Sequence, residues 1–405
     1  CTRDSLEVVT MIADKMVNLV NNSSVIRAMF EEGRRLAGIY GADKVYDFSL
    51  GNPNVPAPKE VNKAIHDIIN EEDSVFVHGY MSNSGYEDVR EAIADSLNRR
   101  FGTHFSFNNI IMTVGAAGGI NSFFRAFVNP GDEIIAFAPY FGEYRAYAAN
   151  VDAELVVIPP DTDTFQPDLA AFEKAITPKT KVVIVNTPNN PTGVVYSEKT
   201  ITEMADILRK KQKEYGTVIA LFSDEPYREL AYDGVKVPYL TKYYENTVVG
   251  YSYSKSLSLP GERIGYLVIP DEFDDSAKVI TACNVATRVL GFVNAPSLMQ
   301  RVILRCVDVD VSSNIAVYNR NRETLYKGLR DLGFECIKPE GAFYMFVKTP
   351  IDDVEFSNMA KKHNILVVPG SSFACKGFVR IAYCVSYDTV VNSLPEFKKL
   401  AEELK

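Results

Sequence analysis

Lys255 stands among small hydroxyl side chains in the run Ser252–Leu257, and Arg263 follows it eight residues later. A lysine acts as a covalent catalyst only when its amine is uncharged or held as an imine, which requires a partly buried, electropositive setting. Arg263 could supply the positive charge. Because most lysines are exposed and solvated, the hypothesis of an imine-forming lysine beside a phosphate depends on the motifs elsewhere in the chain.

Two other polar groups directly follow apolar runs. Asn190 lies in the segment Asn186–Gly193, where two prolines fix the backbone; an ordinary turn built from turn-forming residues is the alternative. Asp224 comes just after the apolar run 218–222. An acid in that position is expected to be buried, or nearly so, and then needs a cationic partner.

A third motif, Gly115-Ala116-Ala117-Gly118-Gly119, opens a predicted helix that runs through Phe127. Small residues at the start of a helix expose backbone N–H groups at the positive end of the helix dipole, and these can bind a phosphate. A glycine-rich turn used only for close packing is the alternative interpretation.

The elements that position these groups are short apolar runs alternating with helical patterns. Such alternation indicates an α/β fold with a largely parallel sheet covered on both faces, and ligands bind at the carboxyl ends of its strands. The predicted strands are 110–114, 133–138, 181–185, 218–222, 247–251 and 264–269. After Pro296, a long helical region through Arg330 and strands near 342–347, 365–368 and 378–383 predict a second, α+β lobe.

Composition narrows the classes of function. A chain of 405 residues exceeds the usual size of a single core, and its net charge of −9 disfavours nucleic acid and anionic membranes as partners. No run of 18 apolar residues predicts a membrane span. The six cysteines form no CxxC pair, so no metal site is expected, and with no evident leader the expected location is cytoplasmic.

Over roughly Ser24–Lys405, the chain resembles the class I/II (aspartate aminotransferase-like) family of fold-type I, pyridoxal-phosphate-dependent aminotransferases. The resemblance implies a large domain with a mostly parallel seven-stranded sheet between helices and a smaller α+β domain. It places residues 60–295 in the large cofactor-binding domain, 24–59 and 296–405 in the small domain, and 1–23 in an N-terminal arm. A native start at Met11 would leave residues 1–10 outside the native protein.

The motifs that carry the resemblance are Asn189-Asn190-Pro191-Thr192-Gly193, Ser223-Asp224-Glu225-Pro226-Tyr227, Ser252-Tyr253-Ser254-Lys255 with Arg263, and Arg380 in Phe378–Tyr383.

The resemblance implies catalytic roles for three residues, Lys255, Asp224 and Tyr227. Lys255 would hold pyridoxal 5′-phosphate as an imine and then move the proton between the substrate α-carbon and the cofactor. Asp224 would pair with the pyridine nitrogen and keep it protonated, so that the ring can accept electrons. Tyr227 and Asn190 would hydrogen-bond the 3-oxygen of the ring and tune the proton affinity of the imine.

The same resemblance implies how the rest of the cofactor is held. Ser252, Arg263 and the amides of Gly115, Ala116 and Ala117 would bind the phosphate. Tyr140 would stack on the pyridine ring, although Phe141 is the alternative and a core role for Tyr140 is also possible. Tyr80 resembles a tyrosine that reaches the phosphate in the neighbouring subunit, which implies a homodimer with shared active sites.

Substrate contacts follow in the same way. Arg380 would clamp the substrate α-carboxylate with two parallel N–H bonds, aided by Asn190 and the backbone of Gly51. Ala117 replaces a lysine that meets the distal carboxylate in one subgroup, which weakens a dicarboxylate interpretation. Arg288 occupies a place similar to another subgroup's distal-carboxylate arginine, which acts across the dimer; a solvated arginine on a helix is the alternative.

The leading hypothesis is therefore an amino-acid:2-oxo-acid aminotransferase that works by ping-pong transamination, with aspartate or another acidic amino acid as a candidate donor. A C–S β-lyase, a decarboxylase or a racemase would use much of the same set of residues, because the cofactor supplies the chemistry. A non-catalytic regulatory module that binds the cofactor is the alternative from another class. The N-terminal stretch is too short and insufficiently basic for the DNA-binding domain that such regulators attach.

Overall fold

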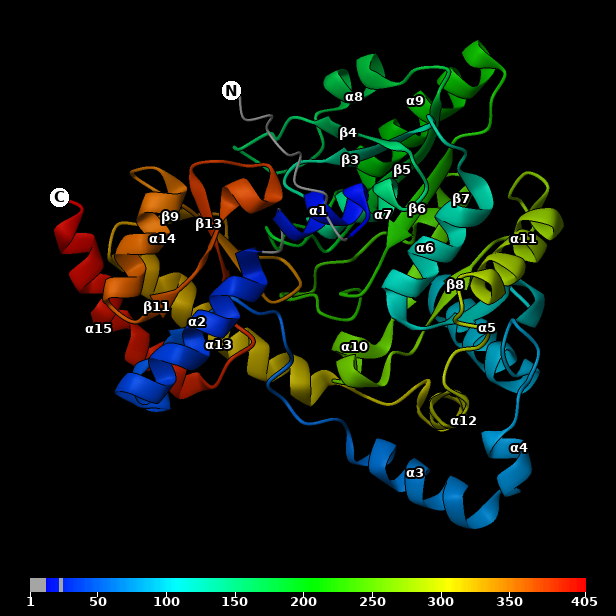
Figure 1. Cartoon of the computed structure of the whole chain (residues 1–405), viewed down its shortest axis with the longest axis horizontal. Helices are drawn as coiled ribbons and strands as arrows, with labels where there is room; N and C mark the ends of the chain where they lie inside the picture. Colours follow the sequence, from blue (N-terminus) through cyan, green and yellow to red (C-terminus); the bar gives the residue numbers. More distant parts are fainter. Residues whose placement is uncertain (1–11, 22–24) are drawn as a thin grey trace, which may run out of the picture.

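A computed structural model describes residues 12–21 and 25–405. Residues 25–405 form a larger and a smaller lobe (Figure 1). Within residues 25–405, seven strands of the larger lobe form one sheet in the order β2-β8-β7-β6-β5-β3-β4. β8 is antiparallel to both of its neighbours, and the other neighbouring pairs are parallel. The strands are β2 Ile110–Thr113, β3 Glu133–Phe137, β4 Glu154–Ile158, β5 Thr180–Asn186, β6 Ala220–Asp224, β7 Thr247–Ser252 and β8 Gly265–Val268.

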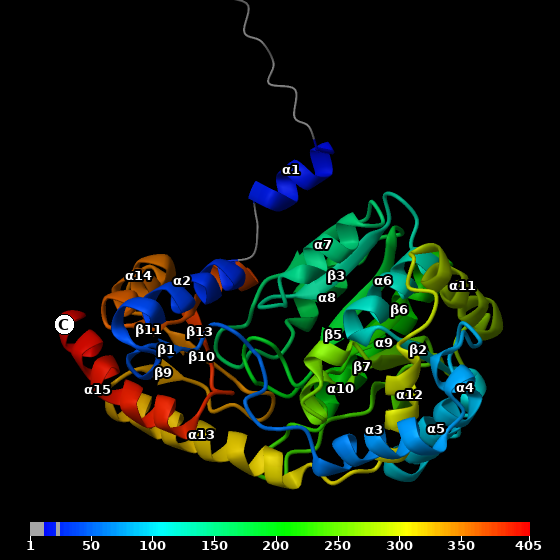
Figure 2. The same ribbon diagram turned by 60° about the horizontal axis from the view of Figure 1, so that its bottom comes forward.

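Both faces of this sheet are buried, which explains the apolar runs of its strands. In β5, for example, Val182 and Ile184 pack into the core on one face, whereas Val183 and Val185 pack into the core on the other. Helices α6, α7 and α11 contribute to the first core, and α8 and α9 contribute to the second (Figures 1 and 2). These helices are α6 Gly115–Phe127, α7 Glu143–Ala149, α8 Leu169–Ala175, α9 Glu198–Tyr215 and α11 Ser276–Val289.

The smaller lobe is an α+β unit around an antiparallel sheet, in the order β12-β13-β10-β9, with a separate parallel pair, β1-β11. Residues 29–55 belong to it structurally, because Met29 and Leu36 pack against Leu366, β1 pairs with β11, and Phe48 packs in its core. Its strands are β1 Tyr46–Asp47, β9 Glu335–Cys336, β10 Tyr344–Lys348, β11 Ile365–Leu366, β12 Val368–Pro369 and β13 Phe378–Ala382, and its helices are α2 Val25–Tyr40, α13 Ser312–Asp331, α14 Asp353–Lys362 and α15 Tyr387–Glu403.

The predicted α/β class and mostly parallel seven-stranded sheet are confirmed. The six runs read as strands correspond to β2, β3, β5, β6, β7 and β8. The seventh strand, β4, lies at the edge of the sheet, and its apolar run is only Leu155–Ile158, which gives a weak sequence signal. In the second lobe, the pattern revealed neither β1 nor β9, which are two residues long.

The single helical region predicted after Pro296 is wrong in one respect, because it is two helices separated at residues 307–311. α12 packs with α3 and α5 in a core of the larger lobe, which favours moving the predicted domain boundary from 295 to beyond Cys306. The division into domains stays a prediction, and residues 1–11 and 22–24 of the predicted arm, including 1–10, lie outside the described residues. The remaining helices are α1 Asp14–Asn21, α3 Lys59–Glu71, α4 Ser74–His78, α5 Glu87–Phe101, α10 Tyr253–Ser256 and α12 Ser297–Cys306.

In the part of the chain that the structure describes, every helix is too short or too polar to cross a lipid bilayer.

Candidate active site

One edge of the seven-stranded sheet gathers most of the predicted site residues. Strands β2, β6 and β7 end there. Gly115 follows β2, Asp224 is the last residue of β6, and Ser252 is the last residue of β7. Because β8 runs antiparallel to its neighbours, Arg263, which precedes β8, lies at the same edge. Most of the predicted site residues therefore lie at the carboxyl ends of the parallel strands, as expected for an α/β sheet.

Lys255 lies on α10, the short helix that directly follows β7. Ser252 caps this helix, because its side chain accepts a hydrogen bond from the Ser254 amide. The Lys255 Nζ donates to the carbonyl of Gly51 at 2.7 Å and lies 5.5 Å from the centre of the Phe343 ring. Burial lowers the pKa of Lys255 to about 8. A substantial share of this amine is therefore uncharged, and nucleophilic, at mildly alkaline pH.

Asp224 ends β6 and is buried. Its Oδ2 accepts a hydrogen bond from the Tyr144 hydroxyl, whereas its Oδ1 is buried and has no partner among the described residues. Burial raises the pKa of Asp224 to about 7, although the bond from Tyr144 opposes this shift. A buried acid with one unpaired oxygen suits a cationic N–H donor that the described residues do not supply.

Arg380 crosses from β13 of the smaller lobe to the Asn190 loop. Its Nη1 donates to Asn190 Oδ1 at 3.0 Å and its Nη2 donates to the Ser49 carbonyl at 2.6 Å. The side chain of Asn186 accepts from the Asn190 amide at 2.8 Å and fixes the loop. Arg380 is 1% exposed, and burial lowers the pKa of its guanidinium. Its Nε lacks a partner among the described residues, so a buried cation without a carboxylate faces the site.

Tyr227 and Tyr344 link the two lobes. Their hydroxyl oxygens lie 2.8 Å apart, and the Tyr344 ring lies 4.6 Å from the Arg380 guanidinium carbon. Burial raises the pKa of Tyr227 well above its usual value. A side chain at Gly51 would put its Cβ 2.0 Å from the Tyr344 hydroxyl, so the close approach of these segments requires glycine.

The glycine-rich motif starts α6 as predicted. Gly115 has φ +73°, and a Cβ there would lie 2.6 Å from Arg263 Nη2. Ala116 and Ala117 are partly exposed in the first turn of α6. Arg263 Nη1 donates to the Pro260 carbonyl at 2.9 Å. A cation thus lies against the N-terminal turn of a helix, an arrangement that suits a bound phosphate.

Tyr140 is buried and follows β3, whereas the alternative Phe141 is only partly buried. The Tyr140 hydroxyl accepts a hydrogen bond from Arg145 at 2.8 Å. Its ring is nearly parallel to that of Tyr144, at 6.3 Å between centres and 9° between planes. This packing places Tyr140 beside the partner of Asp224, where an aromatic ring could cover a planar ligand.

Tyr80 and Arg288 are not brought together with the other predicted residues. Tyr80 is 93% exposed, and Arg288 is exposed in the last turn of α11. Neither side chain hydrogen-bonds a residue of this site within residues 12–21 and 25–405. Both assignments depended on a second subunit, so a single chain leaves them as predictions.

Three contributors were missed by sequence reasoning. Tyr144 gave only a weak signal, its spacing of four residues from Tyr140. Tyr344 and the Ser49 carbonyl gave none, because their contacts with Tyr227 and Arg380 join segments 117 and 331 residues apart. Long-range contacts of this kind are set by the packing of the two lobes.

Comparisons with known proteins agree with this geometry. Residues 43–394 match the family model described as aminotransferase class I and II. The crystal structure of an amino transferase from Eubacterium rectale superposes with a TM-score of 0.94 at 47% identity and covers 98% of this chain and 100% of that one.

Curated relatives match over nearly their whole length. An aspartate aminotransferase of Thermotoga maritima is 28% identical over 93% of this chain and 96% of its own. An aromatic-amino-acid aminotransferase of Thermococcus litoralis is 28% identical over 95% of this chain and 97% of its own. The predicted family and enzyme class are confirmed: the chain is an aminotransferase and belongs to the class I and II aminotransferase family.

Proposed function

We propose that this chain binds pyridoxal 5′-phosphate and transfers amino groups between an amino acid and a 2-oxo acid by ping-pong kinetics. The family to which it belongs uses this cofactor. The observation that carries the proposal is the unpaired, buried Oδ1 of Asp224 at the same sheet edge as Lys255, whose pKa is lowered to about 8. The unpaired carboxylate of Asp224 suits the protonated ring nitrogen of the cofactor. The amine of Lys255 suits its aldehyde.

When bound, the cofactor accepts the electron pair that is released at the substrate α-carbon. Lys255 would hold it covalently and, once freed by the substrate amine, would move the proton at that carbon. Asp224 would keep the ring nitrogen protonated, and Tyr227 and Asn190 would hydrogen-bond the 3-oxygen. Ser252, Arg263 and the amides of Gly115, Ala116 and Ala117 would hold the phosphate, and Tyr140 would cover the ring.

Arg380 is proposed to bind the substrate α-carboxylate. Its burial and the lack of a carboxylate partner among the described residues support this proposal. Arg380→Ala should lower kcat/KM for every amino donor. The decrease should correspond to a loss of about 2–5 kcal/mol of transition-state stabilisation. Steady-state kinetics with several donors measure this effect. Arg380→Lys is the matched control, because it keeps a charge but loses the two-pronged geometry, and should recover only part of the activity. Near-normal kcat/KM for all donors in Arg380→Ala would exclude the clamp.

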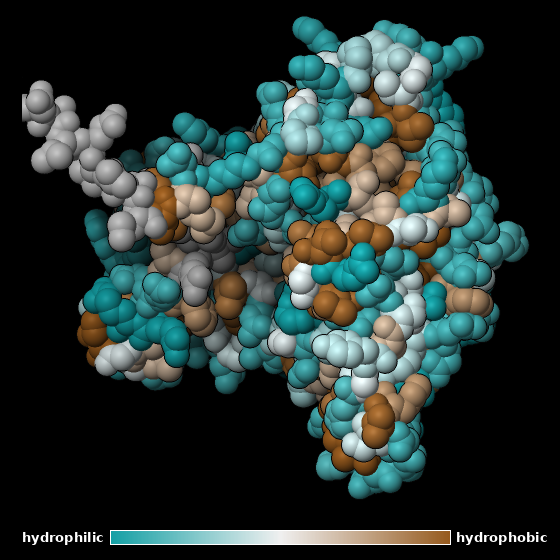
Figure 3. Space-filling model, turned by 45° about the vertical axis from the view of Figure 1, so that its right-hand side comes forward, coloured by the Kyte–Doolittle hydropathy of each residue, from teal (hydrophilic) through white to brown (hydrophobic). Residues whose placement is uncertain are grey.

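We propose a homodimer in which each subunit completes the other's active site. Large hydrophobic side chains are exposed on α3, α4 and α11, and Figure 3 shows hydrophobic groups on one face, including the lower tip where α3 and α4 lie. Burial of such patches in an isologous interface would remove them from water. Tyr80, which follows α4, would then reach the partner's phosphate site. The exposed side chains are Ile69, Val75 and Phe76 on α3 and α4, with Val285, Val289 and Leu290 on and directly after α11.

The proposed donor is aspartate or another acidic amino acid, and an aromatic donor is the second candidate. The names of the two curated relatives support these two classes. Ala117 offers no charge to a distal carboxylate, so Arg288 of the other subunit is proposed to bind it. The described cysteines, which lie between residues 283 and 384, are free and mostly buried, which supports a proposed cytoplasmic location.

Arg288→Leu should therefore lower kcat/KM for aspartate and glutamate by about 10- to 150-fold, because a hydrogen bond to a charged group is lost. The kcat/KM for phenylalanine should change little. Equal losses for acidic and aromatic donors would contradict a role in recognising the distal carboxylate.

Hybrid dimers test the shared site directly. Mixing Arg288→Leu chains with Lys255→Ala chains gives hybrids in which one site contains an intact Lys255 and an intact Arg288 from the other chain. Activity with aspartate should rise above that of either variant alone. If exchange of chains occurs without this rise, Arg288 does not act across the dimer.

A further inference from the structure

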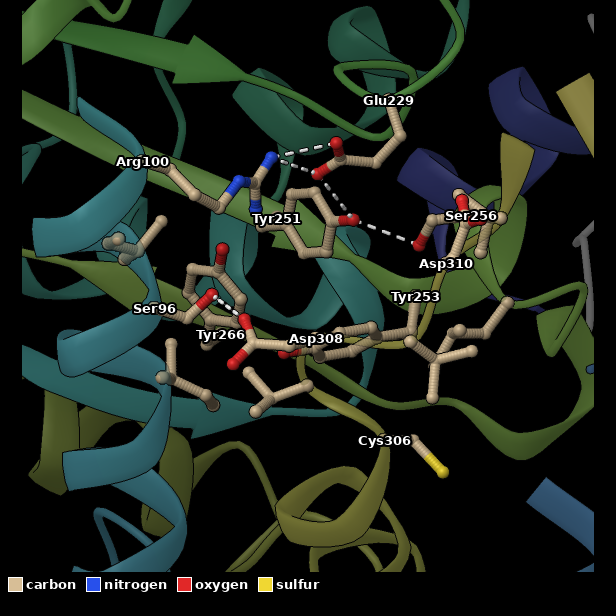
Figure 4. Close-up of a pocket in the computed structure, with 16 residues that line it drawn as sticks. Ser96, Arg100, Glu229, Tyr251, Tyr253, Ser256, Tyr266, Cys306, Asp308 and Asp310 are labelled. Carbon is tan, nitrogen blue, oxygen red and sulfur yellow. Dashed lines mark hydrogen bonds and ion pairs between the residues drawn. The ribbon is translucent and has the colours of Figure 1, made fainter. Parts of the chain in front are cut away.

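A pocket of about 230 Å³ lies beside α10, among α5, β7, β8 and residues 306–311 (Figure 4). We call it the tyrosine pocket, because Tyr251, Tyr253 and Tyr266 line it. None of the residues proposed to bind cofactor or substrate lines it, so it is separate from the candidate active site. Ser256 and Leu257, which follow Lys255, also form part of its wall.

The three tyrosines form a continuous aromatic wall. Ring centres lie 4.9 Å apart for Tyr251 and Tyr266, 5.1 Å for Tyr251 and Tyr253, and 5.9 Å for Tyr253 and Tyr266. The Tyr251 hydroxyl donates to Ser256 Oγ at 2.9 Å. Aromatic faces carry partial negative charge and attract organic cations.

Two of the hydroxyl groups in this wall have no partner. Tyr253 and Tyr266 are 5% and 4% exposed, and within the described residues no hydrogen bond reaches either hydroxyl. Neither hydroxyl oxygen is fully buried among the described residues, so both are open to the pocket and available to a molecule that enters it. Both hydroxyls belong to side chains that line the pocket, so a bound ligand that donates hydrogen bonds would satisfy them.

The charged side chains around the pocket favour a cationic ligand. The pocket lining contains three carboxylates, Glu229, Asp308 and Asp310, and one guanidinium, Arg100. Asp308 is already paired with Arg99, which lies outside the lining, so Asp310 carries the one unpaired negative charge of the described lining. Arg100 Nη2 already donates to both oxygens of Glu229 at 2.7 Å, as Figure 4 shows. Asp310 accepts bonds only from Ser312 and has no cationic partner in the described chain. An anionic ligand would meet repulsion here.

We propose that the tyrosine pocket binds a small organic ammonium ion. Its volume equals that of about seven or eight waters, at roughly 30 Å³ each, which suits an amine of similar heavy-atom count. The ammonium N–H donates to the free tyrosine hydroxyls, its charge is balanced by Asp310, and its alkyl groups contact the aromatic faces. Because Tyr253 and Ser256 flank Lys255 on α10, the bound ion contacts the helix that carries the catalytic lysine.

Isothermal titration calorimetry on the cofactor-loaded enzyme tests this proposal. The probe is N,N-dimethylethanolamine, a tertiary amine that is protonated at neutral pH and cannot condense with an aldehyde as a primary amine does. Its neutral isostere, 3-methyl-1-butanol, has the same shape without the charge. We expect saturable binding of one amine per chain and at least about tenfold weaker binding of the alcohol. Because heat is measured, the result does not depend on transamination.

Matched variants locate the binding. Tyr266→Phe removes a hydroxyl that makes no internal hydrogen bond, so it should not destabilise the fold, yet it should weaken amine binding about tenfold. Asp310→Asn should weaken it by a similar factor. Tyr239→Phe is the control, because the Tyr239 hydroxyl likewise has no hydrogen-bond partner among the described residues but does not line the pocket. Absence of saturable amine binding, equal binding of the alcohol, or unchanged binding in both test variants would overturn the proposal.

Discussion

Replacing Lys255 with alanine should lower kcat for transamination by about 10⁴-fold, because it removes the group proposed to move the proton at the substrate α-carbon. It also removes the proposed covalent attachment point of the cofactor. Burial lowers the pKa of this amine to about 8, so the wild-type group can be uncharged when it accepts a proton. A methyl group in its place can neither hold the cofactor nor transfer a proton.

The measurement pairs kinetics with mass spectrometry. Borohydride reduction followed by denaturation should leave the cofactor attached to wild-type protein and not to Lys255→Ala. Lys242→Ala is the control, because Lys242 is exposed and lies outside the site; its activity and its labelling should match wild type. Transamination at the normal rate by Lys255→Ala would remove the basis of the proposed chemistry.

Much of the site could be predicted because parallel strands place the residues that follow them at one edge. Asp224, Lys255 and the Gly115 motif each come directly after an apolar run, so their proximity needs only the topology of the sheet. Arg263 joins them because β8 is antiparallel, which the sequence alone did not reveal. The sequence pattern therefore predicted the proximity of those candidate site residues that follow the strands of the parallel sheet.

The rest depended on contacts that no local pattern contains. The helical period of Ser297–Cys306 predicts a helix but not that Met299 and Ile303 pack with α3 and α5 rather than in the second lobe. Tyr344 reads as one residue of an apolar strand, and only the meeting of the two lobes brings its hydroxyl to Tyr227. Tyr80 and Arg288 are exposed in one chain, so their proposed roles depend on the proposed partner subunit.

Asp224→Asn is expected to cause the second large loss, about 150- to 5,000-fold in kcat, which corresponds to the 3–5 kcal/mol cost of leaving a buried charge unpaired. Asparagine has nearly the same shape and can still accept the hydrogen bond from Tyr144, but it cannot hold the ring nitrogen in its protonated form. Tyr144→Phe is the graded control: it keeps the carboxylate and removes one hydrogen bond, so its loss should be nearer tenfold. Equal kcat for wild type and Asp224→Asn would contradict the assignment.

The pH dependence of stability separates this role from that of an ordinary buried acid. In the cofactor-free protein, burial raises the pKa of Asp224 from 3.8 to about 7. The folded state therefore keeps its proton to higher pH than the unfolded state, so this contribution to stability is complete below pH 3.8 and is lost as pH rises through 7. Chemical denaturation of cofactor-free wild type should show a decline of up to about 4 kcal/mol over this window that is absent in Asp224→Asn. Saturation with the cofactor should abolish the decline, because a protonated ring nitrogen stabilises the ionised carboxylate; a decline that persists would mean that Asp224 does not face the ring.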